Sequence, residues 1–225
     1  MRIRLAQTAS LAVFAVTSLA AQATTVFSDD FSGGNPSAAT SYGLIAAGSY
    51  SLPGQYRVVS DPSAEFTNGY VSYFDHTTGA AGGAMLFFDG AASPIPIWSQ
   101  AASLLAGTTY SFSFFASSGG PLSTPTLNVL IDGVATGATA STTVGAWTQY
   151  TYAYAPASAG THTFSIVDSN LEALGNDGAL DDISLSTAAV AAVPEPSTVG
   201  LMLAGLVGLQ VGARKRCASR GRRAS

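Results

Sequence analysis

The feature that most constrains the fold is an alternation of apolar and polar residues at every second position through the middle of the chain. It is clearest in four segments: Tyr110–Phe114, Thr126–Ile131, Tyr150–Tyr154 and His162–Ile166. Successive side chains of a β-strand point to opposite faces, so a period of two predicts half-buried strands. No long apolar stripe at helical spacing appears between residues 24 and 186. This part of the chain is therefore predicted to be all-β.

Turn-forming residues separate the predicted strands. They stand at Ser118–Pro121, Asp132–Gly133, Ser158–Gly160 and Asn176–Gly178. About nine to eleven short strands divided by such turns are typical of a β-sandwich of the jelly-roll type. We expect this sandwich to span residues 24–186 as one domain. The Ala-rich segment 187–192 is predicted to be a tether.

The two signs of charge occupy different parts of the sequence. Residues 24–193 hold twelve acidic residues and a single basic residue, Arg57, which gives this part a formal charge of −11. Nucleic acids and anionic lipids are bound by Lys and Arg, so a nucleic-acid partner is excluded. Eleven Phe, nine Tyr and two Trp in the whole chain supply enough apolar surface for a folded core. The only cysteine, Cys217, lies outside the predicted domain.

The N-terminus has the order of parts found in a secretory signal. Arg2 and Arg4 precede the apolar stretch 11–20, and Ala21-Gln22-Ala23 follows. A charged start, a short apolar run and a small-x-small site are typical of a cleaved signal peptide. The apolar run is too short to span a hydrocarbon core of about 30 Å. We predict a signal peptide at residues 1–23.

The C-terminal part, residues 193–225, combines three elements. It begins with the four residues Val193, Pro194, Glu195 and Pro196. An apolar run at 199–213 follows, and as a helix it would reach only about 22 Å. The cluster 214–223 then starts with the three basic residues Arg214, Lys215 and Arg216. These residues are predicted to stop the helix on the cytoplasmic side of the inner membrane.

This combination resembles the PEP-CTERM sorting signal of Gram-negative bacteria that produce exopolysaccharide. The resemblance implies recognition by an exosortase-type processing enzyme and transient insertion of 199–213 into the inner membrane. It also implies delivery to the cell envelope, the cell surface or the extracellular matrix. The alternative is an ordinary C-terminal membrane anchor.

Acidic residues lie at both ends of the predicted domain. Asp29 and Asp30 stand on the first predicted strand, and Asp181 and Asp182 stand on the last. A period of two places Asp181 on the same face as Ile183. A carboxylate facing a core is costly, so Asp181 is at an exposed strand start, bonded to backbone N–H groups or neutralised by a cation. Since first and last strands often meet in sandwiches, the four carboxylates could supply oxygens to Ca²⁺.

Several short motifs resemble those of bacterial surface proteins with galactose-binding-like jelly rolls. They are Asp29–Phe31, Asp75–Gly79, Trp98–Gln100, Thr108–Phe112 and Asn176–Ile183. The resemblance implies a carbohydrate-binding domain with a structural calcium near Asp29, Asp30, Asp181 and Asp182. The chain departs from the family at Gly178, where an aromatic residue is usual. The alternative is that these acids cap strands and turns without a metal.

Little in the sequence points to catalysis. Residues 24–186 contain two histidines, no G-x-S-x-G elbow and no H-E-x-x-H motif. We interpret His162 as a bonded core or edge residue. Asp75-His76-Thr77 is predicted to close a turn. A glycoside hydrolase would need two paired carboxylates, for which Asp75 and Asp89 are the candidates. We expect a protein that is not an enzyme.

Aromatic side chains are the candidate sugar platforms. Tyr50, Tyr56, Tyr70 and Tyr73 lie in a region rich in Gly, Ser and Pro, whereas Trp98 and Trp147 are predicted to pack in the core. No single residue is predicted as the ligand contact. We expect a non-catalytic, exported module that binds carbohydrate or exopolysaccharide. A purely structural matrix protein is the first alternative, and a glycoside hydrolase is the second.

Overall fold

The computed structural model describes residues 22–36, 38–46, 48–172 and 174–188. Among them are eleven strands and one helix of four residues, which confirms the all-β prediction. One compact unit spans Ala23–Ala188. The predicted sorting signal, and the predicted signal peptide apart from Gln22 and Ala23, lie outside the described residues. No helix within the described ranges is long and apolar enough to cross a membrane.

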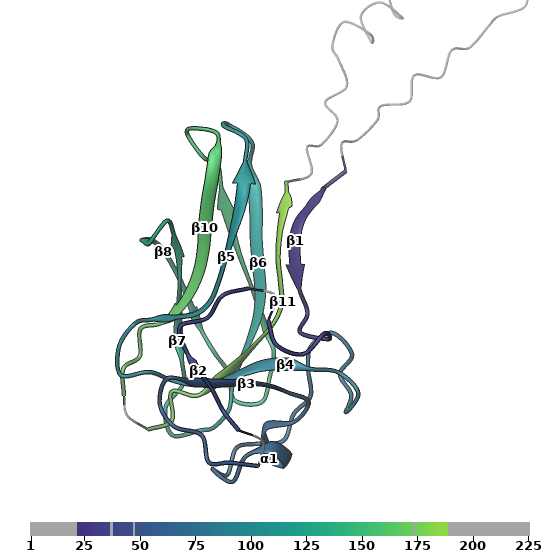
Figure 1. Ribbon diagram of the computed structural model, residues 1–225, viewed down its shortest axis with the longest axis vertical. Coiled ribbons are helices and arrows are strands. Elements are labelled where there is room, and N and C mark those ends of the chain that lie inside the picture. Colours follow the sequence, from purple (N-terminus) through teal and green to yellow (C-terminus); the bar gives the residue numbers. More distant parts are fainter. Residues whose placement is uncertain (1–21, 37, 47, 173, 189–225) are drawn as a thin grey trace, which may run out of the picture. The chain divides into compact units, whose positions relative to one another are not determined.

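The described strands form two stacked sheets, the jelly-roll β-sandwich predicted from the sequence (Figure 1). In sheet order, the larger one holds β2 (Gly43–Leu44), β3 (Gln55–Val59), β4 (Met85–Asp89), β11 (Gly178–Thr187), β6 (Tyr110–Ser118) and β9 (Thr148–Tyr154), and β1 (Thr25–Asp29) also pairs with β11. The smaller one holds β5 (Pro96–Leu104), β10 (Gly160–Asp168), β7 (Thr126–Ile131) and β8 (Val134–Ser141). All described pairs are antiparallel except β2 with β3, which is parallel.

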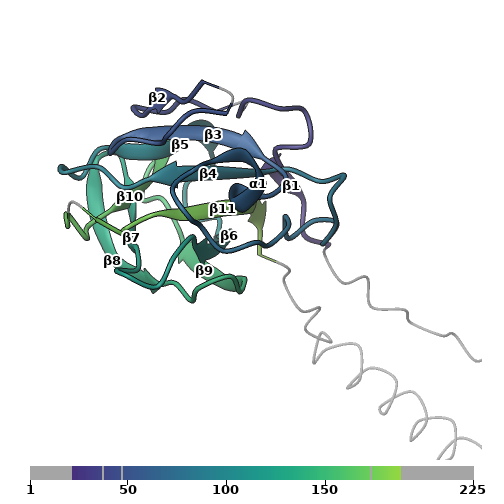
Figure 2. The same cartoon turned by 90° about the horizontal axis from the view of Figure 1, so that it is seen from below.

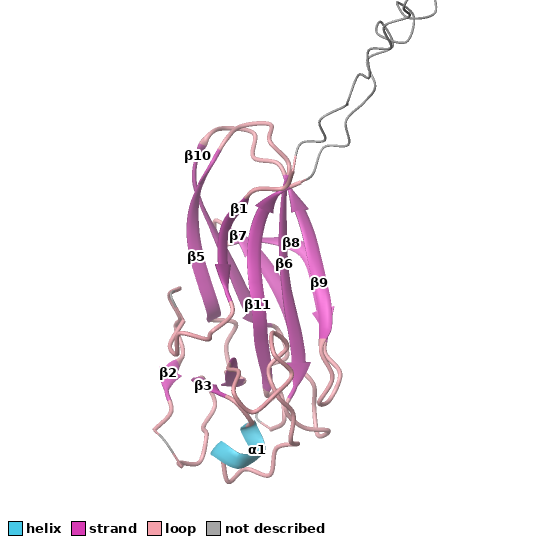
Figure 3. Ribbon diagram, turned by 90° about the vertical axis from the view of Figure 1, so that its right-hand side faces the viewer, coloured by secondary structure: helices cyan, strands magenta, loops and turns pink. Residues whose placement is uncertain are grey.

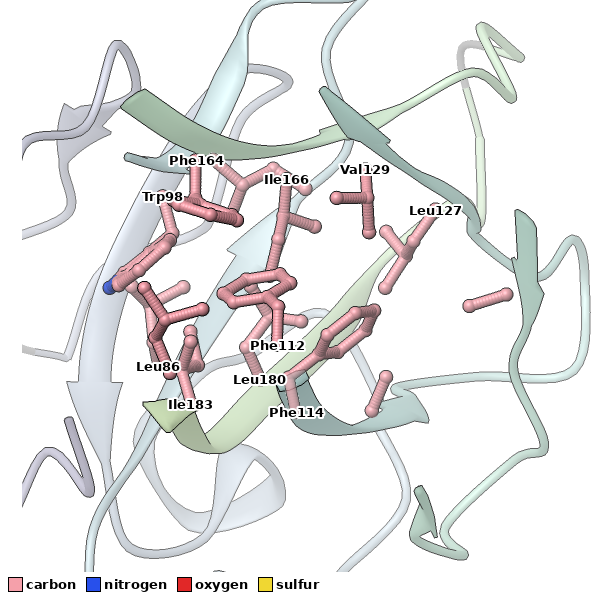
Figure 4. Packing of buried hydrophobic residues seen from close by; sticks show 14 of the residues in the cluster. Leu86, Trp98, Phe112, Phe114, Leu127, Val129, Phe164, Ile166, Leu180 and Ile183 are labelled. Atoms are coloured by element: carbon pink, nitrogen blue, oxygen red, sulfur yellow. The ribbon is translucent and has the colours of Figure 1, made fainter. Parts of the chain in front are cut away.

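Aromatic side chains from both sheets fill the space between them (Figure 4). Phe112 on β6 is completely buried. Its ring centroid lies 5.2 Å from that of Phe164 and 6.0 Å from that of Trp98. Phe27 on β1 closes the group at 6.4 Å from Phe112. The polar residues that alternate with Phe112 and Phe164 turn to the outer faces, as the period of two requires.

A second apolar cluster lies on the other face of the larger sheet. Every residue of β4 is buried, because Leu86 and Phe88 face the main core while Met85 and Phe87 face this second cluster. Phe66 packs against Phe87 at 5.3 Å, directly after the helix α1 (Pro62–Glu65). Figure 2 looks onto the end of the sandwich that carries α1. The segment around α1 therefore forms a third layer over one part of the sheet.

The last strand, β11, organises the larger sheet. Its first part pairs with β4 through Gly178–Leu180, and its second part pairs with β1 along the same edge. The pairing of the first and last strands confirms the expectation from the sequence. The register to β6 shifts between Asp181 and Ser184, and Asp182 has a left-handed φ of 46°. This β-bulge adds one residue and reverses the alternation of faces.

The bulge makes one sequence prediction wrong. Leu180 and Ile183 both face the main core, although they are an odd number of positions apart. Asp181 therefore lies on the opposite face from Ile183, away from the main core. A strict period of two could not show this, because a bulge leaves no apolar or polar mark of its own in the sequence.

The strand also runs further than predicted. Thr187, placed at the start of the tether, is the last residue of β11, since its N–H donates to Thr24 O at 2.9 Å. The N–H of Ala188 donates to Thr109 O at 2.9 Å. The start of β1 and the end of β11 thus lie at the end of the sandwich opposite α1 (Figure 3).

Replacing Phe112 by alanine is expected to lower the free energy of unfolding by about 3–5 kcal/mol, because it leaves a cavity where both sheets meet. Urea denaturation followed by tryptophan fluorescence measures this loss. The control is Leu105→Ala, at a side chain that is 67% exposed, where the change should stay within about 0.5 kcal/mol. Equal losses in the two variants would contradict the packing described above.

Candidate ligand-binding site

A cavity of about 490 Å³ opens at the end of the sandwich that carries α1. We call it the loop cavity, because most of its wall comes from loops. It is lined by Tyr50–Pro53, Asn68–Tyr70, Asp89, Gly120–Leu122, Leu174, Gly175 and Asp177. These residues lie before β3, after α1, at the end of β4, after β6 and before β11. The sandwich thus brings five separate segments of the chain to one site.

Two acidic side chains form the polar part of the loop cavity. Asp89 and Asp177 are only 7% and 8% exposed, and their carboxyl groups lie within hydrogen-bonding reach of each other. The hydroxyl of Ser51 donates to Asp89 Oδ2 at 2.7 Å and lies 2.6 Å from the hydroxyl of Tyr70. The N–H of Gly90 donates to Asp177 Oδ1 at 3.3 Å. A hydrogen bond between two carboxyl groups requires that one of them keeps a proton.

Burial governs the ionisation of this pair. It raises the pKa of Asp177 to about 7, and the nearby charge of Asp89 adds to the rise. Burial also raises the pKa of Asp89, against the hydrogen bonds from Ser51 and Asp177. For Tyr70, burial and then the charge of Asp177 raise the pKa above its ordinary value. The phenol therefore stays protonated, and at mildly acidic pH the pair carries one proton.

The rim of the loop cavity is apolar and exposed. Tyr50 is 62% exposed, Leu122 81% and Leu174 76%, and Leu52 is also exposed. Large apolar side chains on a cavity rim mark a binding surface more often than isolated ones elsewhere do. The loop cavity therefore has an aromatic and aliphatic rim above a floor of hydrogen-bonding groups.

Close backbone approaches hold the loops that build the cavity. A Cβ at Gly90 would lie 2.1 Å from the side-chain amide of Asn176, so only glycine allows the segment before β11 to approach the end of β4. Gly175 has a φ of 91°, and a Cβ there would lie 2.7 Å from Leu122 Cβ. The two loops that carry Leu122 and Asp177 are thus packed directly against each other.

The aromatic candidates from the sequence divide into two groups. Tyr50 and Tyr70 line the loop cavity, whereas Tyr56 and Tyr73 are buried in the main and second apolar clusters. Trp98 is fully buried, as predicted. Trp147, by contrast, is partly buried against the second cluster, and its Nε1 donates to Phe74 O at 2.8 Å. The sequence reasoning placed Asp177 in a turn and in the Asn176–Ile183 motif, but did not identify it as a ligand-binding residue.

The two carboxylates considered for hydrolysis have separate environments. Asp75 is buried and accepts from the N–H and hydroxyl of Thr78 at 2.7 and 2.8 Å, so it closes the turn predicted there. Asp89 lies in the loop cavity, where its carboxyl partner is Asp177. Asp75 does not line this cavity.

The turn that follows Asp75 is hydrogen-bonded to the bulge of β11. Asp181 Oδ2 accepts from the N–H of His76 at 2.7 Å and from the N–H of Thr77 at 3.2 Å. Asp182 lies 2.6 Å from His76 Nδ1 and accepts from the Thr77 hydroxyl at 2.7 Å. The His76 ring stacks on Phe115 with centroids 3.4 Å apart. We call residues 75–78 the latch. Of the three environments considered for the Asp181 carboxylate, the structure shows hydrogen bonding to backbone N–H groups.

The four predicted calcium ligands are only partly brought together. A hollow of about 290 Å³ between β1 and β11 is lined by Asp29, Asp30 and Asp182, but not by Asp181. Asp29 accepts from Trp98 Nε1 at 3.2 Å, and Asp30 accepts from the Ser32 hydroxyl at 2.7 Å. Among the described residues, no group of three or more His, Cys, Asp or Glu is placed to hold a metal. The structure thus brings three of the four carboxylates to one hollow, and calcium stays a prediction.

Stability is expected to fall as pH rises from about 4 to 7. Burial raises the pKa of Asp168, Asp177 and Asp181 to about 6, 7 and 6. The unfolded chain loses these protons near pH 4, so the folded state binds more protons across that range. Urea denaturation at several pH values across this range measures the slope of the free energy of unfolding against pH. Asp177→Asn should flatten it, and a slope of opposite sign would contradict the assignment.

Replacing His76 by alanine tests how much the latch contributes to the stability of the domain. His76→Ala is expected to lower the free energy of unfolding by about 1–2 kcal/mol, because a ring stack and hydrogen bonds are lost. Leu105→Ala, at a side chain that is 67% exposed, is the control and should change the free energy of unfolding by no more than about 0.5 kcal/mol. Thermal melting in EDTA and in calcium completes the test. A midpoint that rises with calcium would instead support the predicted calcium site.

Comparison with known proteins supports the sorting signal. Residues 192–216 match the PEP-CTERM protein-sorting motif, which confirms the resemblance noted from the sequence. The chain is thus marked as an exported protein that is sorted at the cell surface. A search among curated proteins gave no significant match.

Several solved structures are similar to the chain. The C-terminal domain of the sugar-binding protein EclA shares 16% identity over 40% of this chain and 66% of that chain, with a TM-score of 0.37. The CBM22-1 xylan-binding domain of Paenibacillus barcinonensis Xyn10C shares 12% over 77% and 100%, with a TM-score of 0.43. The CBM22-2 domain of the same protein shares 15% over 72% and 99%, with a TM-score of 0.44.

Proposed function

We propose that this chain is an exported, non-catalytic carbohydrate-binding protein whose ligand occupies the loop cavity. The observation that carries the proposal is the combination of an exposed aromatic, Tyr50, with hydrogen-bonding groups in one cavity of about 490 Å³. A sugar ring has apolar faces and a polar edge. Binding sites for such molecules are concave, with apolar walls and a few placed polar groups. Tyr50 can cover a ring face while Ser51, Asp89 and Asp177 bond the hydroxyl groups.

The position of the cavity suits display on a tethered protein. The loop cavity opens at the end that carries α1. Ala188, the last described residue, is bonded to Thr109 at the start of β6, at the opposite end (Figure 3). A ligand in the cavity therefore does not compete with the point where the domain continues into the C-terminal segment.

Binding without turnover is the proposed role, because the carboxyl pair is unsuited to glycoside hydrolysis. Hydrolases that use two carboxylates hold them about 5–10 Å apart, on either side of the bond that is cleaved. Asp89 and Asp177 instead lie within hydrogen-bonding reach of each other. Two carboxyl groups in direct contact cannot flank a glycosidic bond, so they serve better as a hydrogen-bonding surface.

The sorting motif supports the rest of the proposal. We propose that an exosortase-type enzyme processes the C-terminal segment after residues 199–213 have entered the inner membrane. The protein would then reside in the envelope or matrix of a Gram-negative bacterium. Exopolysaccharide is the carbohydrate available in such a place, and we propose it as the partner of the loop cavity.

Tyr50→Ala is expected to weaken polysaccharide binding about tenfold, the effect of losing about 1–2 kcal/mol of aromatic contact. Affinity electrophoresis of the purified full chain in gels containing different polysaccharides measures the loss. Leu44→Ala is the matched control, because Leu44 is similarly exposed at 58% but lies outside the cavity. If no polysaccharide retards the unaltered chain, the proposed function is wrong, and a purely structural matrix protein becomes the better interpretation.

A further inference from the structure

The loop cavity has an acidic floor and no basic side chain to balance it. Arg57 is the only Lys or Arg between residues 24 and 193. Its Nε lies 3.0 Å from Glu65 Oε1, and its Nη1 donates to Ile45 O at 3.1 Å. The guanidinium is therefore already neutralised by protein groups, and it does not line the cavity.

The groups that face the carboxyl pair are neutral or acidic on every side. Ser51 and the phenol of Tyr70 face Asp89, and the N–H of Gly90 faces Asp177. The remaining titratable neighbours are the phenols of Tyr42 and Tyr73. In this setting the pair can reduce its mutual repulsion in only two ways: it can keep a proton, or it can receive a cation from a ligand.

We propose that the loop cavity selects sugars with a free amino group, whose ammonium replaces the shared proton between Asp89 and Asp177. This inference rests on the proposed function and narrows it to one class of carbohydrate. The ligand brings one positive charge, both carboxyl groups become ionised, and one proton leaves to solvent. An ammonium has three N–H donors, enough to bond both carboxylates and one further acceptor.

The same arrangement disfavours other sugars. An N-acetylated sugar carries no charge and would leave the proton in place. An acidic sugar would set a second negative charge beside the singly protonated pair, with no Lys or Arg in the cavity wall to compensate. The exposed side chains of Tyr50, Leu122 and Leu174 can cover the ring of either kind of sugar, so discrimination falls to the carboxyl pair.

Calorimetric titration of the purified full chain with two matched oligomers tests this inference. The ligands are a tetramer of glucosamine and a tetramer of N-acetylglucosamine, used near pH 6, where an amine of this kind is largely protonated. The glucosamine tetramer is expected to bind at least about tenfold more tightly. Repeating the titration in buffers of different ionisation enthalpy should show release of about one proton per site on binding.

Two variants identify the groups that release the proton. Asp177→Asn and Asp89→Asn each keep the shape of the side chain but leave a single carboxyl group, so proton release and the preference for glucosamine should both disappear. The control is Glu172→Gln, which removes an exposed charge from the same segment before β11 without touching the cavity lining. If one asparagine variant fails to fold, the other variant and the proton count of the unaltered chain still decide the matter.

The outcomes separate this inference from the proposed function. Equal affinity for the two tetramers without proton release would overturn the inference while carbohydrate binding stands. Binding of neither tetramer nor any neutral polysaccharide would overturn both. Proton release on adding calcium chloride, with none on adding the glucosamine tetramer, would assign the pair to a metal and also overturn the inference.

Discussion

The bulge in β11 is the constraint on which the rest of the structure depends. The strand lies in the middle of the larger sheet, where β4 and β1 share one of its edges. One added residue at Asp182 lets Leu180 and Ile183 both face the main core, and it turns Asp181 to the opposite face of the sheet, where its side chain is still buried. Without the bulge, either an apolar side chain or a carboxylate would point to the wrong side, at a cost that a small domain could not easily offset.

The latch and the second apolar cluster follow from that constraint. Because Asp181 is buried on that opposite face, its carboxylate needs donors, and the N–H groups of His76 and Thr77 provide them. The hydrogen bonds between this turn and the sheet hold in place one end of the segment that also carries Tyr70. Tyr70 is held in turn by Phe87, with centroids 4.6 Å apart. One wall of the loop cavity is thus positioned by contacts made with the central strand and with β4.

The sequence was sufficient for the fold and for only part of the site. A period of two in β6 and β7 reports directly which side chains meet in the core, since burial alternates from Tyr110 to Ala116 in β6 and along the whole of β7. The same reasoning failed at Asp181, where a backbone irregularity changed the face. The pairing of Asp89 with Asp177 could not be predicted either, because 88 positions separate them and only the packing of Gly90 against Asn176 brings them together. Tyr50 and Tyr56 are alike in the sequence, and only the exposure of Tyr50 in the folded chain distinguishes it from Tyr56.

The uneven distribution of charge explains why the buried pair persists. Residues 24–193 have one guanidinium, and it is held by Glu65. Sharing a proton lets Asp89 and Asp177 remain buried at mildly acidic pH, whereas at higher pH each ionised carboxyl repels the other in a poorly hydrated site. A domain selected for stability alone would gain by replacing one of them with an apolar residue. The pair instead lines an open cavity with an exposed aromatic rim. A binding role would compensate for the cost of burying two carboxyl groups.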